Sequence, residues 1–172
     1  MQPITTSLCI GLLLCSTVIH AQKCENDVPK TGNDSRYEIL SNGSEVRDKK
    51  TNLIWQRCSL GQKWDGNTCI GTAQDYSWDE ALTIIGKLGT QYRMPNIKEL
   101  QSLADYQCMQ PAINSNIFPN TPAEVFWSSS AYGNPSNVWT VDFEYGETSI
   151  VQFFVSYYYK SAKARAIRSE NK

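Results

Sequence analysis

The residues best suited to chemistry lie in two polar, tyrosine-containing segments in the last third of the chain. Residues 131–137 read AYGNPSN, and residues 156–161 read SYYYKS. Tyrosine offers a large rigid contact area, while Ser, Gly and Asn supply adaptable hydrogen bonds, so this composition is typical of recognition surfaces. Three consecutive tyrosines in a strand cannot all face a core, because successive side chains point to opposite faces.

The two segments predict either a ligand-binding surface or ordinary sheet surface, and the sequence leaves both interpretations open. If they bind one ligand, they must lie side by side at the same end of a sheet, with their rings partly exposed. The residues that this interpretation places against the ligand are Tyr132, Asn134, Asn137, Tyr157, Tyr158, Tyr159 and Lys160.

Between these segments, residues 139–144 alternate between apolar and polar types. A strand with one buried face produces this period of two. We therefore expect Trp139, Val141 and Phe143 to face a core. The other set, Thr140, Asp142 and Glu144, is expected to face solvent.

Residues for nucleophilic or metal-assisted catalysis are scarce. The only histidine, His20, lies in a stretch that we expect to be removed, which leaves no imidazole for a Ser/His or Cys/His pair or for a metal. The run Ser128–Ser130 lacks the G-x-S-x-G pattern of a nucleophile elbow and is expected to support the sheet. Asp65-Gly66-Asn67 is expected to form a tight turn rather than a calcium cage. The sequence predicts a protein that is not an enzyme and needs no cofactor or metal.

The N-terminus has the features of a secretory signal peptide over residues 1–21. Its apolar run, residues 8–19, is shorter than the roughly 20 residues of a membrane span, and a small residue, Ala21, follows it. An uncleaved anchor or a lipoprotein signal is the alternative, although Leu14 before Cys15 does not fit a lipidation site. We expect an exported protein that is periplasmic, on the cell surface or secreted, with no transmembrane segment in the mature chain.

Cleavage after Ala21 leaves four of the six cysteines, and an even number in an exported chain indicates disulfides. Four thiols allow three pairings. The short loop between Cys58 and Cys69 makes these the local pair, which leaves Cys24 to pair with Cys108. Residues 22–36 then form a lead-in pinned by Cys24, ahead of a single domain over residues 37–170.

The chain's charge is balanced, with 16 basic and 17 acidic residues. This balance provides no basic surface for nucleic acid and no polybasic segment for a membrane. A mildly basic C-terminal end is expected to be a solvated strand end; it comprises Lys160, Lys163, Arg165 and Arg168.

The first half of the chain predicts strands followed by helices. A hairpin is expected over residues 37–48, because Asn42-Gly43 is a strong turn signal, and another strand over residues 53–58. Two helices follow, over residues 77–88 and 96–104, each with apolar residues at helical spacing.

Both helices begin with a capping box, formed by Ser77 with Glu80 and by Asn96 with Glu99. Arg93 lies between them and is expected to be buried and to bridge to the second helix. Short strands follow at residues 126–127, 138–143, 150–155 and 164–168. The order strands, helices, strands predicts an α+β domain with helices packed against antiparallel strands.

Several separate motifs, in this order, resemble the bacterial DUF1566 family, the domain also named for the C-terminal part of a Legionella collagen-like adhesin. They run from about Cys24 almost to the end of the chain. The stretches are TNLIWQRCSLGQKWDGNTC, YSWDEAL, YRMPNIKELQSLADY, PAINSNIFPNTP, FWSSSAY and VWTVDFEYG.

The resemblance implies a C-type-lectin-like fold of the formylglycine-generating-enzyme type, in which two helices pack against short twisted strands that present irregular loops. Relatives hold sugars, proteins or peptides on those loops, and the collagen-like adhesin binds sulfated polysaccharides. In relatives diversified by retroelements, the C-terminal region carries the variable binding positions.

The chain departs from the enzymes and calcium-dependent lectins of this fold. No cysteine follows Cys108, whereas the formylglycine-generating enzymes carry reactive cysteines late in the chain. Gln110-Pro111-Ala112 and Trp139-Thr140-Val141 lack the carboxylates and amides with which those lectins coordinate calcium. The basic surface of a sulfated-polysaccharide binder is also weak.

We therefore expect an exported, non-enzymatic binding module that recognises a glycan, a polysaccharide or a surface protein through its C-terminal loops, as an adhesin does. The alternative is a structural or assembly component of the cell envelope that docks on a partner protein. An enzyme of unknown class is the third choice.

Overall fold

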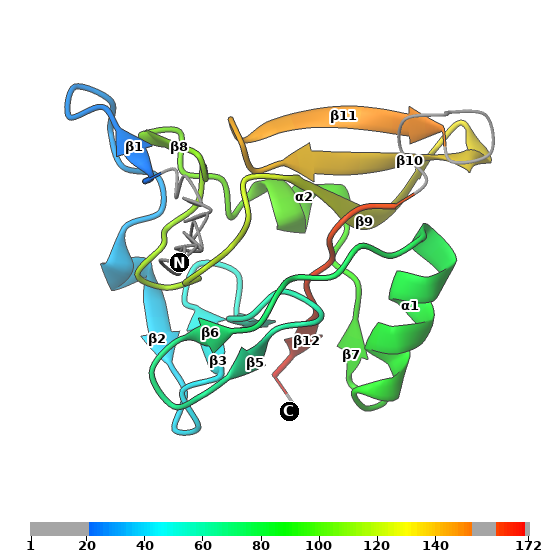
Figure 1. Ribbon diagram of the computed structural model, residues 1–172, viewed down its shortest axis with the longest axis horizontal. Helices are drawn as coiled ribbons and strands as arrows, with labels where there is room; N and C mark the ends of the chain where they lie inside the picture. The colour runs from blue at the N-terminus through cyan, green and yellow to red at the C-terminus, as the bar shows by residue number, and fades with distance from the viewer. Residues whose placement is uncertain (1–20, 153–160, 171–172) are drawn as a thin grey trace, which may run out of the picture.

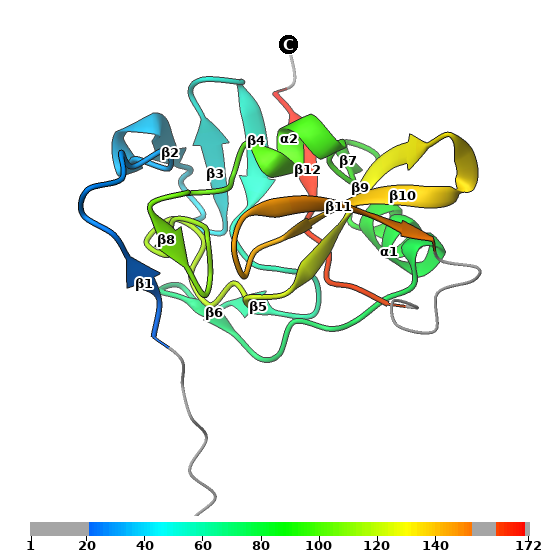
Figure 2. The same cartoon turned by 90° about the horizontal axis from the view of Figure 1, so that it is seen from above.

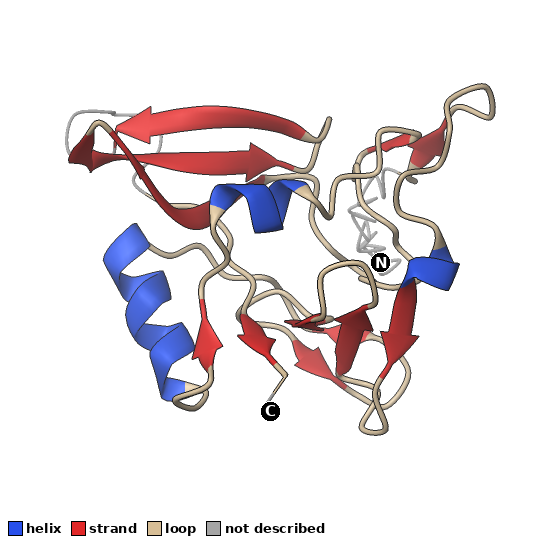
Figure 3. Ribbon diagram, turned by 180° about the vertical axis from the view of Figure 1, so that it is seen from behind, coloured by secondary structure: helices blue, strands red, loops and turns tan. Residues whose placement is uncertain are grey.

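The computed structural model describes residues 21–152 and 161–170. Residues 1–20 of the predicted signal peptide and the segment Tyr157–Lys160 lie outside this part. In it, four small sheets and two short helices follow the order strands, helices, strands, as the α+β prediction requires (Figures 1 and 3). No helix of the described residues is long and apolar enough to cross a membrane.

The largest sheet is antiparallel, with five strands in the order β2-β3-β4-β12-β7. The predicted turn joins β2 to β3: Asn42 Oδ1 accepts a hydrogen bond from Ser44 N, and Gly43 has a φ of 69°, which glycine adopts at little cost. Strand β12, from the last described segment, lies between β4 and β7 and so pairs with two strands from the first half of the chain and its middle. The strands are β2 (Tyr37–Ile39), β3 (Glu45–Asp48), β4 (Leu53–Gln56), β7 (Tyr92–Arg93) and β12 (Ile167–Ser169).

A second sheet, in the order β11-β10-β9, lies apart from the first, with helix α2 against β9 and β10 (Figures 1 and 2). Its strands are β9 (Val125–Tyr132), β10 (Asn134–Asp142) and β11 (Glu147–Gln152). Two smaller sheets pair β1 (Lys23–Cys24) with β8 (Cys108–Met109) and β5 (Lys63–Trp64) with β6 (Cys69–Ile70). A 3-10 turn, Asp34–Arg36, precedes β2.

Both predicted capping boxes are present. Helix α1 (Trp78–Lys87) begins at Ser77, whose backbone N–H donates to Glu80 at 2.9 Å. Helix α2 (Ile97–Gln101) begins at Asn96, whose backbone N–H donates to Glu99 at 2.7 Å. Helix α2 is shorter than predicted because the chain turns after it and Ala104 pairs with Ile113.

Two apolar clusters form the core, and neighbouring residues of β9 enter one each. Phe126 packs with Trp55, Leu100 and Phe143 in the first cluster. Trp127 packs in the second, with Ala81 and Ile85 of helix α1 among its members. Because successive side chains of a strand point to opposite faces, β9 contributes side chains to both clusters.

Both predicted disulfides are present. Cys58–Cys69 closes the loop that carries β5 and β6, and Asp65 forms the predicted turn there by accepting from Asn67 N and Thr68 N at 2.8 Å. Cys24–Cys108 joins β1 to β8 across 84 residues of sequence.

The prediction of a solvated basic C-terminal end is wrong for its described residues. Lys163 and Arg165 are buried, at 5% and 0% exposure, and Arg168 binds Glu45 with two hydrogen bonds of 2.8 Å. Lys163 forms ion pairs with Asp75 and Glu124. Neighbouring strands lie along both edges of this segment, because Trp127 N donates to Lys163 O on one side and Leu60 N donates to Ala164 O on the other.

Arg93 bridges to the second helix as expected, but it is exposed rather than buried. Its guanidinium binds the Glu99 carboxylate at 2.7 and 2.8 Å. The same carboxylate caps helix α2, so Arg93 fixes the helix start from the surface.

Two buried carboxylates in the five-stranded sheet predict acid sensitivity. Burial would raise the pKa of Glu45, but hydrogen bonds from Arg168 and Tyr92 outweigh it and the pKa is lowered from 4.5. Burial likewise opposes the lowering of the Asp48 pKa, which hydrogen bonds from Arg36 and Thr51 produce. A lowered folded-state pKa stabilises the protein above the unfolded value, and this stability is lost as pH falls through the folded value.

We therefore expect the free energy of unfolding, measured with denaturant from pH 6 to pH 3, to fall below a pH of about 4.5. Glu45→Gln should be less stable than wild type at pH 6, and the difference should shrink as the pH falls. A difference that stays constant down to pH 3 would show that the charge on Glu45 adds nothing to stability.

Candidate ligand-binding site

The described candidate residues lie on the β9–β10 hairpin and on β10. Gly133 forms the turn with a φ of 71°, and Tyr132 pairs with Asn134 across it. Asn137 lies further along β10, after a register shift. The other candidates, Tyr157, Tyr158, Tyr159 and Lys160, lie outside the described residues, so the prediction of one shared surface stays a prediction.

Tyr132 is 50% exposed, and it does not stand alone. Its ring meets the ring of Trp139 edge to face, with centroids 5.4 Å apart and planes at 86°. Ile150 of β11 is 40% exposed and lies directly opposite Trp139 in the antiparallel register, so both side chains share one face of the sheet. We call Tyr132, Trp139 and Ile150 the aromatic patch.

Asn137 adds a polar group beside the aromatic patch. It lies two residues before Trp139 and therefore on the same face of β10, opposite the exposed Gln152. Its Oδ1 atom is buried and has no hydrogen-bond partner among the described residues.

The predicted alternation along β10 is only partly correct. Val141 and Phe143 are buried as expected, but Trp139 is half-buried and Thr140 is fully buried. Thr140 bonds to Ser149 of β11, with 2.8 Å between the hydroxyl oxygens. Val138 and Thr140 are buried on one face of β10, whereas the face of Trp139 becomes buried only at Val141, so burial depends on the position along the strand as well as on the face.

The serine run supports this sheet, as expected. Ser128 is buried and donates to the backbone oxygen of Trp139 at 2.6 Å. The Ser130 hydroxyl accepts from Ile97 N, the first N–H of helix α2, at 3.0 Å. Through these contacts β9 holds β10, which carries Trp139, close to helix α2.

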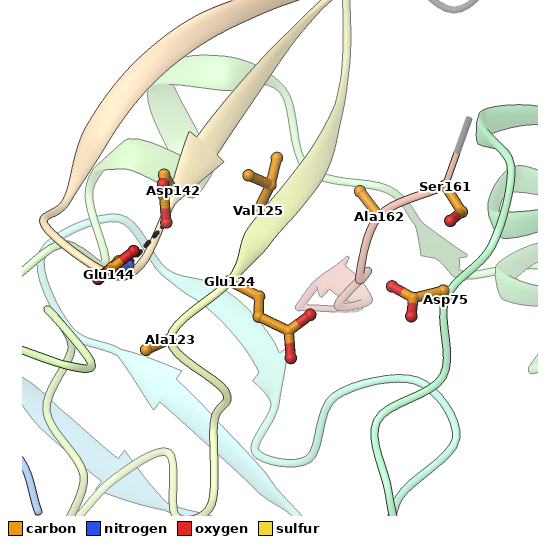
Figure 4. A pocket seen from close by; sticks show the side chains of 8 residues that line it. All are labelled: Asp75, Ala123, Glu124, Val125, Asp142, Glu144, Ser161 and Ala162. Carbon is orange, nitrogen blue, oxygen red and sulfur yellow. Dashed lines mark hydrogen bonds between the residues drawn. The ribbon is translucent and has the colours of Figure 1, made fainter. Parts of the chain in front are cut away.

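An acidic hollow of about 310 Å³ lies at the opposite end of β9 and β10. Figure 4 shows four carboxylates around it: Asp75, Glu124, Asp142 and Glu144. Lys163 balances Asp75 and Glu124, at 2.9 and 3.3 Å. Glu144 raises the pKa of the neighbouring exposed Tyr145, first through a hydrogen bond and then through its charge. The hollow therefore has a net negative charge.

No group of three or more His, Cys, Asp or Glu side chains in the described part of the chain is placed to hold a metal ion.

The residues that form the aromatic patch and the acidic hollow were not all evident from sequence. Ile150 and Trp139 were assigned to ordinary strands, and only the register across β10 and β11 brings them together.

Comparison with known families finds a match to the Lcl C-terminal domain over residues 44–168. Comparison with curated proteins and with solved structures finds no match. The matched region begins within the β2–β3 hairpin, includes both helices and the second sheet, and ends within β12. It covers most of the chain, which therefore belongs to the Lcl C-terminal domain family.

Proposed function

We propose that the protein is an exported, non-enzymatic binding module of the adhesin type, which recognises a glycan or a protein through the aromatic patch. The observation that carries this proposal is the exposed pairing of Tyr132 with Trp139 beside Ile150. Exposed aromatic rings provide apolar contact with little entropy loss.

The two disulfides and the family support export, because disulfides persist in oxidising compartments. The periplasm, the cell surface and the medium all meet this condition. The fold that we propose for the family is the C-type-lectin-like fold, with the hairpin of β9 and β10 as part of its binding surface.

The proposal is tested by applying the oxidised exported protein to an array of neutral and sulfated glycans and to immobilised surface proteins. Tyr132→Ala should weaken binding to the glycan or protein that binds most tightly on the array. The expected loss is about 1–2 kcal/mol, roughly 5–30-fold, which is the range of an interface hot spot. The thermal midpoint should change little, because exposed substitutions cost within about 0.5 kcal/mol.

Tyr145→Ala is the matched control. Tyr145 is also 50% exposed, but it lies in the turn after β10 beside the acidic hollow. The Tyr145→Ala variant should therefore bind the same ligand as tightly as wild type does. Equal losses for the two variants would remove the aromatic patch from the proposal, and an array without any positive would contradict the binding function.

The acidic hollow favours a second function, a cell-envelope component that docks on a basic partner protein. Four carboxylates with one buried lysine attract cationic groups, and this attraction weakens as salt screens it. Co-purification of a basic envelope protein that is lost above about 0.5 M salt and in Glu144→Gln, but retained in Tyr132→Ala, would support this function over the first.

A further inference from the structure

The two disulfides differ in their access to solvent. Cys58 and Cys69 are 9% and 1% exposed, respectively. In the other pair Cys108 is 8% exposed, but Cys24 is exposed. Thiol–disulfide exchange requires a thiolate to reach a disulfide sulfur, so its rate depends on access. A reductant can approach the second bridge through Cys24.

Cys24 belongs to a segment, residues 22–30, that we call the N-terminal strap. None of its residues is buried. Hydrogen bonds also hold the strap to the domain. Gln22 Nε2 donates to the backbone oxygens of Pro111 and Ile113, both at 2.7 Å, and Glu25 N donates to Gln107 O at 2.8 Å. The strap adds no apolar side chain to the core, so the disulfide is its strongest attachment.

The strap also lies outside the region that defines the family. The family match begins at residue 44, so it includes Cys108, Cys58 and Cys69 but not Cys24. The two apolar clusters of the core likewise begin at Tyr37. The domain therefore has its core and one disulfide without any contribution from the strap.

A cavity of about 210 Å³ lies between the strap and the domain. Gln22, Cys24 and Lys30 line it from the strap. Cys108, Ile113 and Asn114 are among the residues that line it from the domain. Release of the strap would remove one wall of this cavity and open its polar floor to solvent.

We propose that Cys24–Cys108 is a reducible latch that holds the strap over this cavity, and that a dithiol opens it while the domain stays folded. One thiolate of the dithiol attacks Cys24 Sγ and forms a mixed disulfide, and the sulfur of Cys108 leaves as a thiolate that takes a proton from water. The second thiol of the dithiol then attacks the dithiol's own sulfur in the mixed disulfide, which closes a disulfide within the dithiol and releases Cys24, the proton of the second thiol passing to the Cys24 thiolate. Two electrons pass from the dithiol to the bridge. The proposal does not depend on ligand binding at the aromatic patch.

The test titrates the oxidised exported protein with dithiothreitol, quenches with iodoacetamide and maps the alkylated cysteines. Cys24 and Cys108 should be alkylated at a dithiothreitol concentration at least about tenfold below that required for Cys58 and Cys69. The near-UV circular dichroism of the buried tryptophans should persist at that concentration. Reduction of both bridges together, reduction of Cys58–Cys69 first, or loss of the near-UV signal as Cys24–Cys108 opens would each overturn the latch.

Hydrogen exchange provides the second measurement. Amides of residues 23–25 should lose protection when the latch opens, while those of β9 and β10 keep theirs. The double variant Cys24→Ser/Cys108→Ser should show the same pattern without any reductant. A double variant that does not fold, or that protects residues 23–25 as well as wild type does, would contradict the proposal.

Discussion

Replacing Arg165 with methionine is expected to lower the free energy of unfolding by at least about 3 kcal/mol, because each buried polar group left without a partner costs about 1–3 kcal/mol. Arg165 is fully buried, and its guanidinium donates to Gln56 O, Arg57 O, Thr121 Oγ1 and Ser59 Oγ. Methionine fills much of the volume but satisfies none of these four oxygens.

The aromatic surroundings of Arg165 add to the expected loss. Its guanidinium carbon lies 4.9 Å from the ring centre of Phe118 and 6.0 Å from that of Phe126. Burial lowers the pKa of Arg165 to about 9, which still leaves it charged at neutral pH. Desolvated cation–π contacts contribute about 2 kcal/mol in such settings.

Denaturant unfolding of Arg165→Met against Arg47→Met checks this expectation. Arg47 also bonds to two side chains, Glu38 and Glu170, but these carboxylates are about half exposed and the pairs lie at the surface. Surface ion pairs contribute about 0–1 kcal/mol, so Arg47→Met should cost little. Equal costs for the two variants would show that the interior hydrogen bonds of Arg165 do not stabilise the fold.

The second large effect is expected for Trp127→Ala, with a loss of roughly 3–5 kcal/mol from the lost burial and the cavity left behind. Trp127 has no exposed surface and packs in the cluster beneath helix α1. Its indole N–H donates to Tyr76 O at 2.8 Å, so the truncation also removes one of the two hydrogen bonds that this oxygen accepts, the other coming from Ala162 N.

Trp139→Ala is the matched control for Trp127→Ala, because both residues lie in the second sheet. Trp139 is only half-buried, and its ring contacts the exposed ring of Tyr132. We expect its loss of stability to be less than half that of Trp127→Ala in thermal or denaturant unfolding. If the two losses are equal, Trp139 belongs to the core and cannot offer its ring to a ligand.

Features that depend on local sequence were predictable. A capping box needs only residues three apart, so Ser77 with Glu80 and Asn96 with Glu99 predicted both helix starts. The spacing of Cys58 and Cys69 likewise identified the local disulfide.

Features that depend on which strands become neighbours were not predictable in the same way. The repeat Ala162-Lys163-Ala164-Arg165 has the alternation of a solvated strand, yet the structure covers both of its faces. Lys163 and Arg165 can be buried because backbone and side-chain oxygens from distant segments of the chain accept their hydrogen bonds. No pattern along the sequence reports those partners.

The candidate site shows the same division. Composition drew attention to Tyr132 and Asn137, and the structure places both on or beside one exposed face of the second sheet. Trp139 and Ile150 join that face only because β10 and β11 pair with Trp139 opposite Ile150. A single residue of register shift would have placed Ile150 on the other face.

The most direct test of the aromatic patch as a ligand-binding surface is an indole N–H spectrum of the ¹⁵N-labelled protein. Its five tryptophans give five reporters, and Trp139→Phe assigns the one in the patch. Titration with the strongest positive of the glycan and protein array should shift the Trp139 signal and leave the signals of the buried Trp55 and Trp127 in place. A titration that saturates without moving the Trp139 signal would contradict the account.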